Sequence, residues 1–397
     1  MADDTAVNSY DQILYPSFAV PQSHPDRLAT LATLFGMEPA PVGRCRVLEL
    51  GCGDGSNLLP LAAELPESQF LGIDLAARPI EIGRERARGA GLKNLTLRRL
   101  DLMDVADDLG RFDYVIAHGL YSWVPPAVQD RVLAVCRAHL APRGVAFVSY
   151  NAYPGGHLRD MLREMMLFHT RHLDEPRQRI AQARALLKFL HEARREGDEY
   201  QMVLKKEVER VIKFSEDHLF HDDLEEFNLP VYFYQFVEHA GRHGLQYLAE
   251  ADYYEMQDQS LPAEAVEKLR QLADDVVLRE QYADFIKCRR FRQTLLCHRD
   301  VAVEREQRPE QVRRFWVASP ARPARPAPDV KSSAPEKFVG LKGATIETDH
   351  PLAKAAVLHL GERWPMSVPF DELLAGVRER LGTGHGRDAA HDEEDSL

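Results

Sequence analysis

Short apolar runs alternate with segments of helical periodicity between residues 44 and 151. The runs RCRVLELG, QFLGIDL, LTLRRLD, FDYVIAHG and GVAFVSYN predict strands, and the segments between them include stretches whose apolar residues recur at helical spacing. This alternation is typical of right-handed βαβ units. We therefore predict an α/β fold with a doubly wound, mainly parallel sheet, in which ligands bind beyond the carboxyl ends of the strands.

After residue 156 the pattern changes to nearly continuous helical periodicity, which extends to about residue 222. Its methionine-rich stripe, which includes Met161, Met165 and Met166, is typical of an adaptable apolar core. A helix is then predicted over residues 231–244, followed by strands at LQYLAEADYY and near residues 291–297. We interpret these two strands as an antiparallel pair that ends the same sheet. The helical block is then an insertion within the first domain.

A Pro- and Ala-rich segment over residues 318–337 separates this first domain from a smaller C-terminal one. Its composition predicts an extended, mobile linker. Residues 338–381 contain a predicted strand pair and two short helices. The acidic, polar residues 382–397 predict a disordered tail.

The net charge of −12 narrows the range of partners. Nucleic acid normally requires a basic face, so we expect no nucleic-acid partner. The five cysteines are scattered without a C-x-x-C pair, which favours reduced thiols over a disulfide framework or a zinc site. The N-terminus has no signal-peptide pattern, and no apolar run is long enough to cross a bilayer. We therefore expect a cytoplasmic protein without membrane insertion.

A glycine-rich loop, VLELGCGDGSN, follows the first predicted strand. Its alternating Gly51, Gly53 and Gly55 favour a tight turn whose amides face a ligand. A dinucleotide fingerprint requires a third glycine where this chain has Ser56, and no G-K-[ST] follows as in a Walker loop. A nicotinamide oxidoreductase is therefore disfavoured.

Two carboxylates at the ends of the next two predicted strands turn this loop into a candidate site. Asp74 ends the second strand, where it can accept hydrogen bonds from both hydroxyls of a ribose. Asp101 ends the third strand in the same way and can reach an adenine amino group. The three features together favour an adenosine-containing ligand.

The motifs LELGCGDGSN, GIDLA, RRLDLMD and FDYVIAHG resemble the successive motifs of class I S-adenosylmethionine-dependent methyltransferases. YPSFAVPQSHPDRLATLATLFGM, HGLYSWVP, SYNAYPGG and residues 229–254 and 281–298 narrow the resemblance to one bacterial family. That family carries a methyltransferase regulatory domain and includes protein-lysine methyltransferases. HPLAKAAVLHLGERWP resembles its small winged-helix-like C-terminal domain. The resemblance covers most of residues 10–381, and many family members continue further, a difference that bears on substrate docking.

The resemblance implies a Rossmann-like methyltransferase core over residues 44–156, preceded by a cofactor-covering segment over residues 1–43. It implies a helical regulatory region over residues 157–300 that returns to the sheet, and a winged-helix-like domain over residues 338–381. The implied cofactor is S-adenosyl-L-methionine. Its implied contacts are Gly51, Gly53, Gly55, Asn57, Asp74, Leu75, Asp101, Leu102, His118 and Gly119. In the covering segment, Tyr15, Gln22 and His24 are expected to close over it.

Aromatic residues follow the fourth and fifth predicted strands and indicate the kind of methyl acceptor. The rings of Tyr121 and Tyr153 can pack against the alkyl stem of an amine or against its methylated product. These two tyrosines and His118 are our catalytic candidates. Trp123 and Tyr150 are further aromatic residues after the same strands. The loop after the fourth strand reads AHGL, not the Asp/Asn-Pro-Pro-Tyr/Phe of enzymes that methylate adenine or amides. We therefore expect a protein lysine, whose ammonium must lose a proton before it attacks.

Alternatives remain open at this point. The cluster of His218, His221, Asp222 and Asp223 contains side chains of the kind that bind metals. We interpret it as a solvated helix end, because methyl transfer needs no metal. His221 is a remote candidate proton acceptor.

The methyl acceptor can instead be a small molecule, with the helical block as a lid over an enclosed cavity. A protein acceptor requires an open trench beside Tyr121. A third possibility is a non-catalytic S-adenosylmethionine-binding regulatory protein. The oligomeric state is undetermined.

Overall fold

The structure, a computed structural model, describes residues 14–15, 17–193, 198–258 and 261–382. The chain separates into two compact units: unit 1 comprises Met1–Ala32 and Met37–Val303, and unit 2 comprises Thr33–Gly36 and Glu304–Leu397. Residues 1–13 of the covering segment and residues 383–397 of the predicted disordered tail lie outside the described residues. Within the described ranges, no helix is both long and apolar enough to cross a membrane.

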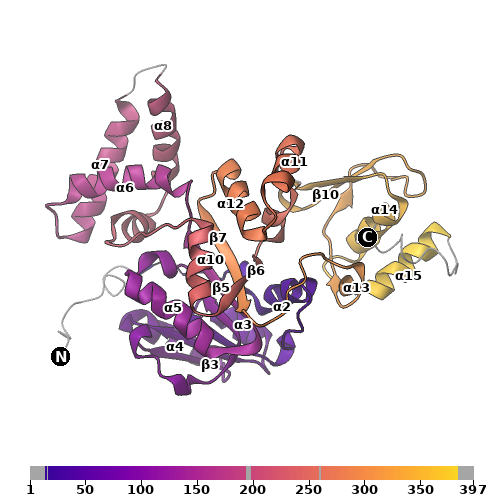
Figure 1. The fold of residues 1–397 in the computed structure, drawn as a ribbon, viewed down its shortest axis with the longest axis horizontal. Coiled ribbons are helices and arrows are strands. Elements are labelled where there is room, and N and C mark those ends of the chain that lie inside the picture. The colour runs from indigo at the N-terminus through magenta and orange to yellow at the C-terminus, as the bar shows by residue number, and fades with distance from the viewer. Residues whose placement is uncertain (1–13, 16, 194–197, 259–260, 383–397) are drawn as a thin grey trace. The chain divides into compact units, whose positions relative to one another are not determined.

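A seven-stranded sheet forms the centre of unit 1, in the order β3–β2–β1–β4–β5–β7–β6 (Figure 1). Its parallel part consists of β1 (Arg46–Leu50), β2 (Gln69–Asp74), β3 (Leu95–Arg99), β4 (Phe112–Ala117) and β5 (Leu140–Asn151). β6 (Leu245–Glu250) and β7 (Phe291–His298) add an antiparallel pair beside β5. The predicted α/β class, the mainly parallel sheet and its antiparallel end are confirmed. Because β1 lies between β2 and β4, the loop after β1 lies where such sheets bind ligands.

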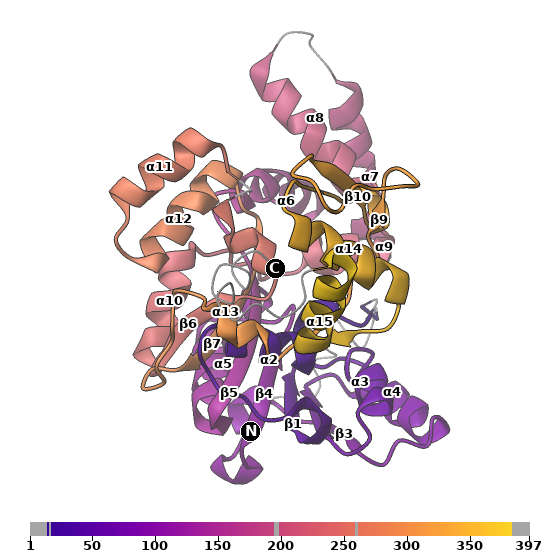
Figure 2. The same ribbon diagram turned by 90° about the vertical axis from the view of Figure 1, so that its right-hand side faces the viewer.

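Helices pack against this sheet and bury its apolar residues. α3 (Leu58–Glu64) and α4 (Ala77–Gly89) contact β2 and β3 (Figure 2). α5 (Pro126–His139) and α10 (Phe233–Arg242) contribute Cys136 and Phe236 to a core that includes Leu48 of β1 and Val115 of β4. α2 (Pro25–Leu34) lies within the covering segment. Apart from the edge strand β3, the parallel strands are thus largely buried, and polar groups reach a ligand mainly from the loops at their carboxyl ends.

The helical block inserted after β5 has a core of its own. It comprises α6 (Gly156–Thr170), α7 (Pro176–Glu192), α8 (Glu199–Val211), α9 (Glu216–Leu219) and a π-helical turn (Phe220–Leu224). Leu162 and Met166 are buried in its interior, whereas Met161 and Met165 pack against that interior only in part. Figure 1 shows α6, α7 and α8 as a group apart from the sheet, which agrees with the predicted insertion. One side of the methionine stripe is therefore core, and the other side is available to line a surface.

A buried arginine joins the antiparallel strands to the helices around them. α11 (Ala263–Leu272) and α12 (Val276–Lys287), for which the sequence pattern gave no prediction, lie between β6 and β7. Arg292 on β7 donates to Asp284 of α12 at 2.8 Å and to Glu250 of β6 at 2.7 Å. Its guanidinium also lies 3.8 Å from the centre of the Phe233 ring of α10. Removing one partner from such a buried pair costs about 3–5 kcal/mol, so this arginine fixes three elements against one another.

Unit 2 is built on two C-terminal helices, α14 (Pro351–Arg363) and α15 (Phe370–Leu381), which share an apolar core. β9 (Arg322–Pro323), β10 (Glu336–Val339) and β11 (Thr345–Thr348) form one small antiparallel sheet. β8 (Trp316–Val317) and β12 (Val368–Pro369) form another, and α13 (Pro309–Val312) precedes them. The small C-terminal domain expected from the sequence therefore has two helices, a three-stranded sheet that precedes them in the chain, and a strand pair whose second strand lies between them.

The Pro- and Ala-rich segment is part of unit 2 and not the mobile linker predicted from its composition. β9 lies inside this segment and pairs with β10. Lys354 of α14 donates to the carbonyl oxygens of Ser332 and Ala334 at 2.5 and 2.9 Å. The Glu336 carboxylate accepts the amide of Asp329 at 2.7 Å. Lys354, which lies beyond the segment, and Glu336, near its C-terminal end, thus hold its backbone, and the composition of the segment does not reveal these contacts.

Two glycines of α4 make a matched pair that tests how tightly this helix packs. A Cβ at Gly83 would meet the carbonyl oxygen of Asp54 at 2.4 Å and Leu97 at 2.6 Å, whereas a Cβ at Gly89 would meet nothing within 4 Å. We expect Gly83→Ala to lower the free energy of unfolding by about 1–3 kcal/mol, because α4 must move away from the glycine loop. Gly89→Ala should raise it by up to about 1 kcal/mol, because alanine favours the helix. Thermal unfolding checks both, and equal stabilities of the two variants would contradict the packing.

Candidate functional site

The glycine loop after β1 has the backbone shape that its sequence predicts. Gly51, Gly53 and Gly55 have φ angles of 69°, 54° and 72°, values that side-chain-bearing residues rarely adopt. The Asp74 carboxylate, at the end of β2, accepts the Gly53 amide and the Ala76 amide, both at 2.8 Å. The end of β2 therefore holds the loop in position. A ligand that approaches this edge meets loop backbone and a carboxylate together.

Glu49 lies directly beneath the loop, and the sequence analysis did not select it. It is buried, and burial raises the pKa of its carboxyl to about 8 despite the hydrogen bond from Asn57. One carboxylate oxygen accepts the Asn57 side-chain amide at 2.8 Å, whereas Oε2 has no hydrogen-bond partner. An acidic residue within the apolar run VLEL was the signal that could have identified it. Such a buried carboxyl group can pair with a cationic group of a ligand.

Asn57 does not lie where the resemblance implied. Its side chain is buried, and its Oδ1 accepts the backbone amide of Val20 at 2.9 Å. Its Nδ2 donates to Glu49 and, at 3.1 Å, to Ser23. Asn57 therefore attaches the covering segment to the glycine loop, and its polar atoms are occupied by protein groups.

The ends of β2 and β3 present a mixed group of residues. Asp101 accepts the Met103 amide at 2.9 Å and begins a short 3₁₀ turn, Leu102–Asp104. Leu75 is 50% exposed, whereas Leu102 is buried in the main core. The Leu102 side chain therefore belongs to the core, and its predicted cofactor contact stays a prediction. Asp101 and Leu75 remain on the open edge next to Asp74.

The end of β4 carries His118 and Gly119, which lie together beside Ser149 of β5. The Ser149 hydroxyl accepts the Gly119 amide at 2.8 Å and lies 3.1 Å from Nδ1 of His118. Burial lowers the pKa of His118 to about 4. This imidazole is thus neutral in the physiological range and is a poor base, although both residues line a cavity as predicted for a site at this edge.

The structure contradicts the placement of Tyr121 at an acceptor site. Its side chain is 2% exposed, and its hydroxyl lies 2.7 Å from Nδ1 of His239 on α10. Its ring packs edge-on against Phe236 and Tyr150, and Tyr150 is itself buried. Tyr121 begins the 3₁₀ turn Tyr121–Trp123 with its side chain directed into the core, and Tyr150 enters the same core from β5. Of this aromatic group, Trp123 reaches the cavity.

That cavity, of about 430 Å³, is formed by four separate parts of unit 1. The covering segment contributes Tyr15 and residues 18–22, and the ends of β4 and β5 contribute His118, Gly119, Trp123 and Asn151. The helical block contributes Arg159, Asp160, Arg210 and Asp222, and the start of β7 contributes Arg290 and Phe291. Phe18 and Phe291, on its wall, are 56% and 40% exposed, so the cavity opens to solvent. Gln22 lies here as expected, whereas His24 pairs with Glu64 at 3.5 Å.

The acidic cluster of the helical block is buried against this cavity and is not the solvated helix end that we predicted. Arg159 pairs with Asp223 at 2.9 Å and with Asp222 at 3.3 Å. Burial raises the pKa of Asp222, although Arg159 opposes the rise. Tyr15 hydrogen-bonds Asp222, and its ring lies 5.6 Å from that of His221, which is 1% exposed. The covering segment folds over these residues and removes them from water.

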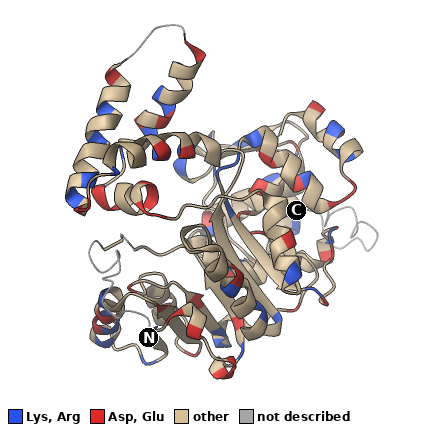
Figure 3. Ribbon diagram, turned by 60° about the vertical axis from the view of Figure 1, so that its left-hand side comes forward, with Lys and Arg blue, Asp and Glu red and all other residues tan. Residues whose placement is uncertain are grey.

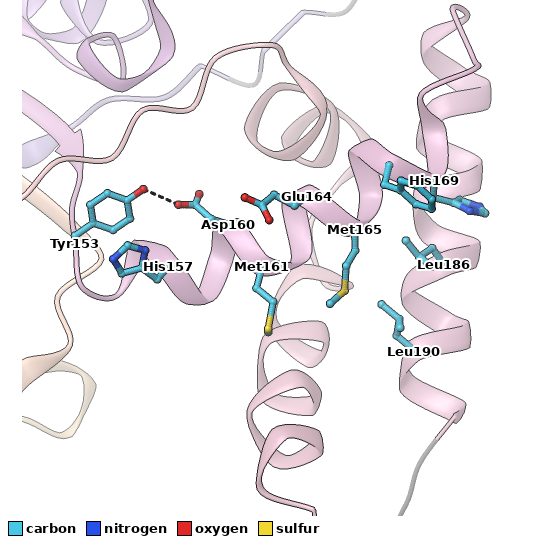
Figure 4. Close-up of a pocket in the computed structure, with 10 residues that line it drawn as sticks. Tyr153, His157, Asp160, Met161, Glu164, Met165, His169, Leu186 and Leu190 are labelled. Atoms are coloured by element: carbon cyan, nitrogen blue, oxygen red, sulfur yellow. Dashed lines mark hydrogen bonds between the residues drawn. The ribbon is translucent and has the colours of Figure 1, made fainter.

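Tyr153 lies in a neighbouring groove of about 700 Å³ between α6 and α7. Figure 4 shows its hydroxyl directed at Asp160, to which it donates at 2.9 Å. The ring stacks on His157 at 3.9 Å. Met161, Met165, Leu186 and Leu190 line the apolar side of the groove, and Glu164 lies one turn beyond Asp160 (Figure 4). Asp160 lines both the groove and the cavity, so the two are neighbours through this carboxylate.

Comparison with known proteins identifies two matched regions and near full-length relatives. Residues 48–146 match the model of a methyltransferase domain, and residues 215–298 match a predicted methyltransferase regulatory domain. The uncharacterized protein RP789 of Rickettsia prowazekii is 36% identical over 380 residues, which cover 94% of this chain and 68% of the relative. The solved structure of PKMT2 from Rickettsia typhi is similar with a TM-score of 0.84 and 33% identity, covering 96% of this chain and 74% of that one. PKMT2 has also been solved in complex with AdoHcy.

Glu49 gives a prediction for stability in the absence of ligand. Its pKa in the folded chain, about 8, is above its ordinary value, so the folded state binds the proton more tightly than the unfolded state. The resulting stabilisation is complete below about pH 4.5 and is lost as the pH rises toward 8, by at most about 1.4 kcal/mol per pH unit. The free energy of unfolding, measured with denaturant, should therefore fall more over this pH window for the wild type than for Glu49→Gln, because glutamine cannot ionise. Parallel pH profiles of the two proteins would contradict the assignment.

Proposed function

Since the chain belongs to the class I S-adenosylmethionine-dependent methyltransferases that carry a methyltransferase regulatory domain, we propose that its methyl acceptor is a lysine side chain of a protein. The chain is a methyltransferase, and its cofactor is S-adenosylmethionine. The similar PKMT2 is a protein-lysine methyltransferase, which supports the same acceptor class here. The observation that carries the proposal is Asp160, which lies between a cavity at the strand ends and an open groove lined by acidic and apolar side chains.

The residues of the loop edge fit the cofactor. The orphaned carboxylate oxygen of Glu49 is a partner for its ammonium group. The loop is closely packed at two of its glycines, because a Cβ at Gly55 would meet Leu97 at 2.9 Å and a Cβ at Gly51 would meet Leu120 at 3.1 Å. We assign Asp74 to the ribose hydroxyls and Asp101, beside Leu75, to the adenine. His118 and Gly119 then lie between the loop and the cavity. When bound, the cofactor supplies an electrophilic methyl group on a sulfonium, so the protein must chiefly align the acceptor and exclude water.

The cavity suits an amine that arrives charged and must become neutral. Asp160 is partly buried, and burial raises its pKa although Tyr153 donates a hydrogen bond to it. Asp222 is paired with Arg159, whereas Asp160 has less positive charge in contact with its carboxylate. Asp160 can therefore orient an incoming ammonium, while transfer into the partly dry cavity lowers the amine pKa and favours proton loss. Tyr15, Trp123 and Phe291 provide aromatic walls for the alkyl stem and for the methylated product.

The groove favours a polypeptide over a small metabolite. It runs along α6, with Asp160 and Glu164 on one side and the apolar residues of α6 and α7 on the other (Figure 4). Phe168, at its edge, is 66% exposed, so the groove is open to solvent. Such a surface fits an extended segment in which basic and apolar residues flank the target lysine. In the described part of the helical block, acidic and basic residues alternate along the ribbon in this view (Figure 3).

A small-molecule acceptor is the second candidate, and the size of the cavity favours it. A volume of about 430 Å³ lies within the range of small-ligand sites. This candidate uses the cavity alone and gives no role to Glu164 or to the apolar side of the groove. Substitutions in the groove therefore separate the two candidates.

Removal of the Asp74 carboxylate should weaken cofactor binding. We expect Asp74→Ala to raise the dissociation constant of S-adenosylmethionine about tenfold to a hundredfold, because a charged hydrogen bond contributes about 1.5–3 kcal/mol. Asp74→Asn should be intermediate, since its amide oxygen still accepts the Gly53 amide. Isothermal titration calorimetry measures both. The exposed Asp108→Asn is the control, and the same affinity for Asp74→Ala and for this control would contradict the assignment.

Methyl transfer tests the acceptor. With tritiated S-adenosylmethionine and a fractionated lysate, we expect label in proteins, and hydrolysis of these proteins should yield methylated lysine. Asp160→Asn and Glu164→Gln should lower kcat/KM for the protein acceptor by about tenfold or more while cofactor affinity stays unchanged. Asp174→Asn, an exposed site outside the groove, should behave as the wild type.

Label confined to small metabolites, or methyl groups on a residue other than lysine, would contradict the proposal. If Asp160→Asn and Glu164→Gln both keep full activity on a protein acceptor, the groove does not bind that acceptor.

A further inference from the structure

Two histidines and an aspartate converge where α10 packs over α5. Nε2 of His239 and Nε2 of His243 lie 3.1 and 2.8 Å from the same Asp130 oxygen. The three ligand atoms all lie within 4.8 Å of one another, and within the described ranges no other group of three or more His, Cys, Asp or Glu side chains does so. These residues are separate from the cavity, the groove and the glycine loop.

The spacing of the three ligand atoms is close to that of a metal site. Donor atoms around a tetrahedral zinc ion, each about 2.0–2.1 Å from it, lie about 3.3 Å from one another. The two Nε2-to-carboxylate distances are shorter than this by a few tenths of an ångström, so a small withdrawal of the Asp130 side chain admits the ion. That side chain is 59% exposed and can make this movement. His239 and His243 are four residues apart, on one face at the C-terminal end of α10, where the helix dipole favours a cation.

The surroundings prepare His239 to act as a ligand. Its Nδ1 lies 2.7 Å from the buried Tyr121 hydroxyl, so Nδ1 has a partner that fixes the ring while Nε2 faces Asp130. Tyr121, displaced from the acceptor site in this structure, becomes a positioning residue for this cluster.

We propose that Asp130, His239 and His243 bind one divalent transition-metal ion of the zinc class, with water in the remaining coordination position. His239 and His243 belong to the region that matches the regulatory-domain model, and Asp130 belongs to the methyltransferase core. The ion therefore joins the two regions through α10 and α5. Tyr121 begins the 3₁₀ turn that ends at Trp123 on the cavity wall, so the same contact also steadies that wall.

The test is metal binding by the full chain without an affinity tag, after treatment with a chelator. Zinc titrated by calorimetry should bind with one ion per chain at low micromolar free metal and should raise the unfolding temperature. Cobalt should give the visible absorption of a four- or five-coordinate nitrogen–oxygen site. Asp130→Asn and His243→Gln should each weaken zinc binding at least about tenfold and remove the cobalt spectrum. The exposed His172→Gln is the matched control and should bind as the wild type.

Binding of S-adenosylmethionine by each variant serves as a check on folding and is expected to stay unchanged. Because zinc binding is measured directly and not through methyl transfer, a failure of the metal proposal can be told apart from a failure of the methyltransferase assignment. The proposal is overturned if the wild type shows no stoichiometric zinc binding. It is also overturned if Asp130→Asn and His243→Gln, with normal cofactor binding, retain wild-type zinc affinity; the cluster is then only a hydrogen-bonded histidine pair.

Discussion

The hydrogen bond from the Gly53 amide to the Asp74 carboxylate is the contact on which the site depends. It ties the loop after β1 to the end of β2 at 2.8 Å, in a backbone shape that only glycine adopts easily. Below this loop, Glu49 and Asn57 form a buried pair, and Asn57 in turn receives the Val20 amide of the covering segment. One connected set of polar groups therefore positions the loop, the carboxylates and the segment that closes the cavity.

The sequence was sufficient for the parts of this arrangement that depend on local patterns. Alternating apolar runs predicted the order of strands and helices in the core, and the three glycines with Asp74 predicted the loop and its partner strand. The neutral His118 and Asp101, both half-buried, also lie at the strand ends where the sequence placed them. Each of these features follows from residues near one another in the chain or from the fixed geometry of βαβ units.

What the sequence could not supply depends on contacts between distant residues. Tyr121 resembled an acceptor-site residue until its hydroxyl was found beside His239, more than a hundred positions away. Glu49 looked like an ordinary strand residue, and its perturbed pKa comes from burial by elements on several sides. The Pro- and Ala-rich segment looked mobile because Lys354 and Glu336, which hold its backbone, lie at its end and beyond it. In each case the tertiary partner decides the role, and local composition does not contain it.

We propose that the loop edge and the open cavity form a single site, with the cofactor at the loop and the acceptor entering past Asp160. A crystal structure of this chain with S-adenosylhomocysteine tests this arrangement. We expect the ligand amino group within hydrogen-bond distance of Glu49, the ribose at Asp74, and the sulfur facing the cavity lined by Tyr15 and Asp160. A ligand whose sulfur faces away from this cavity, or whose amino group has no contact with Glu49, would contradict it.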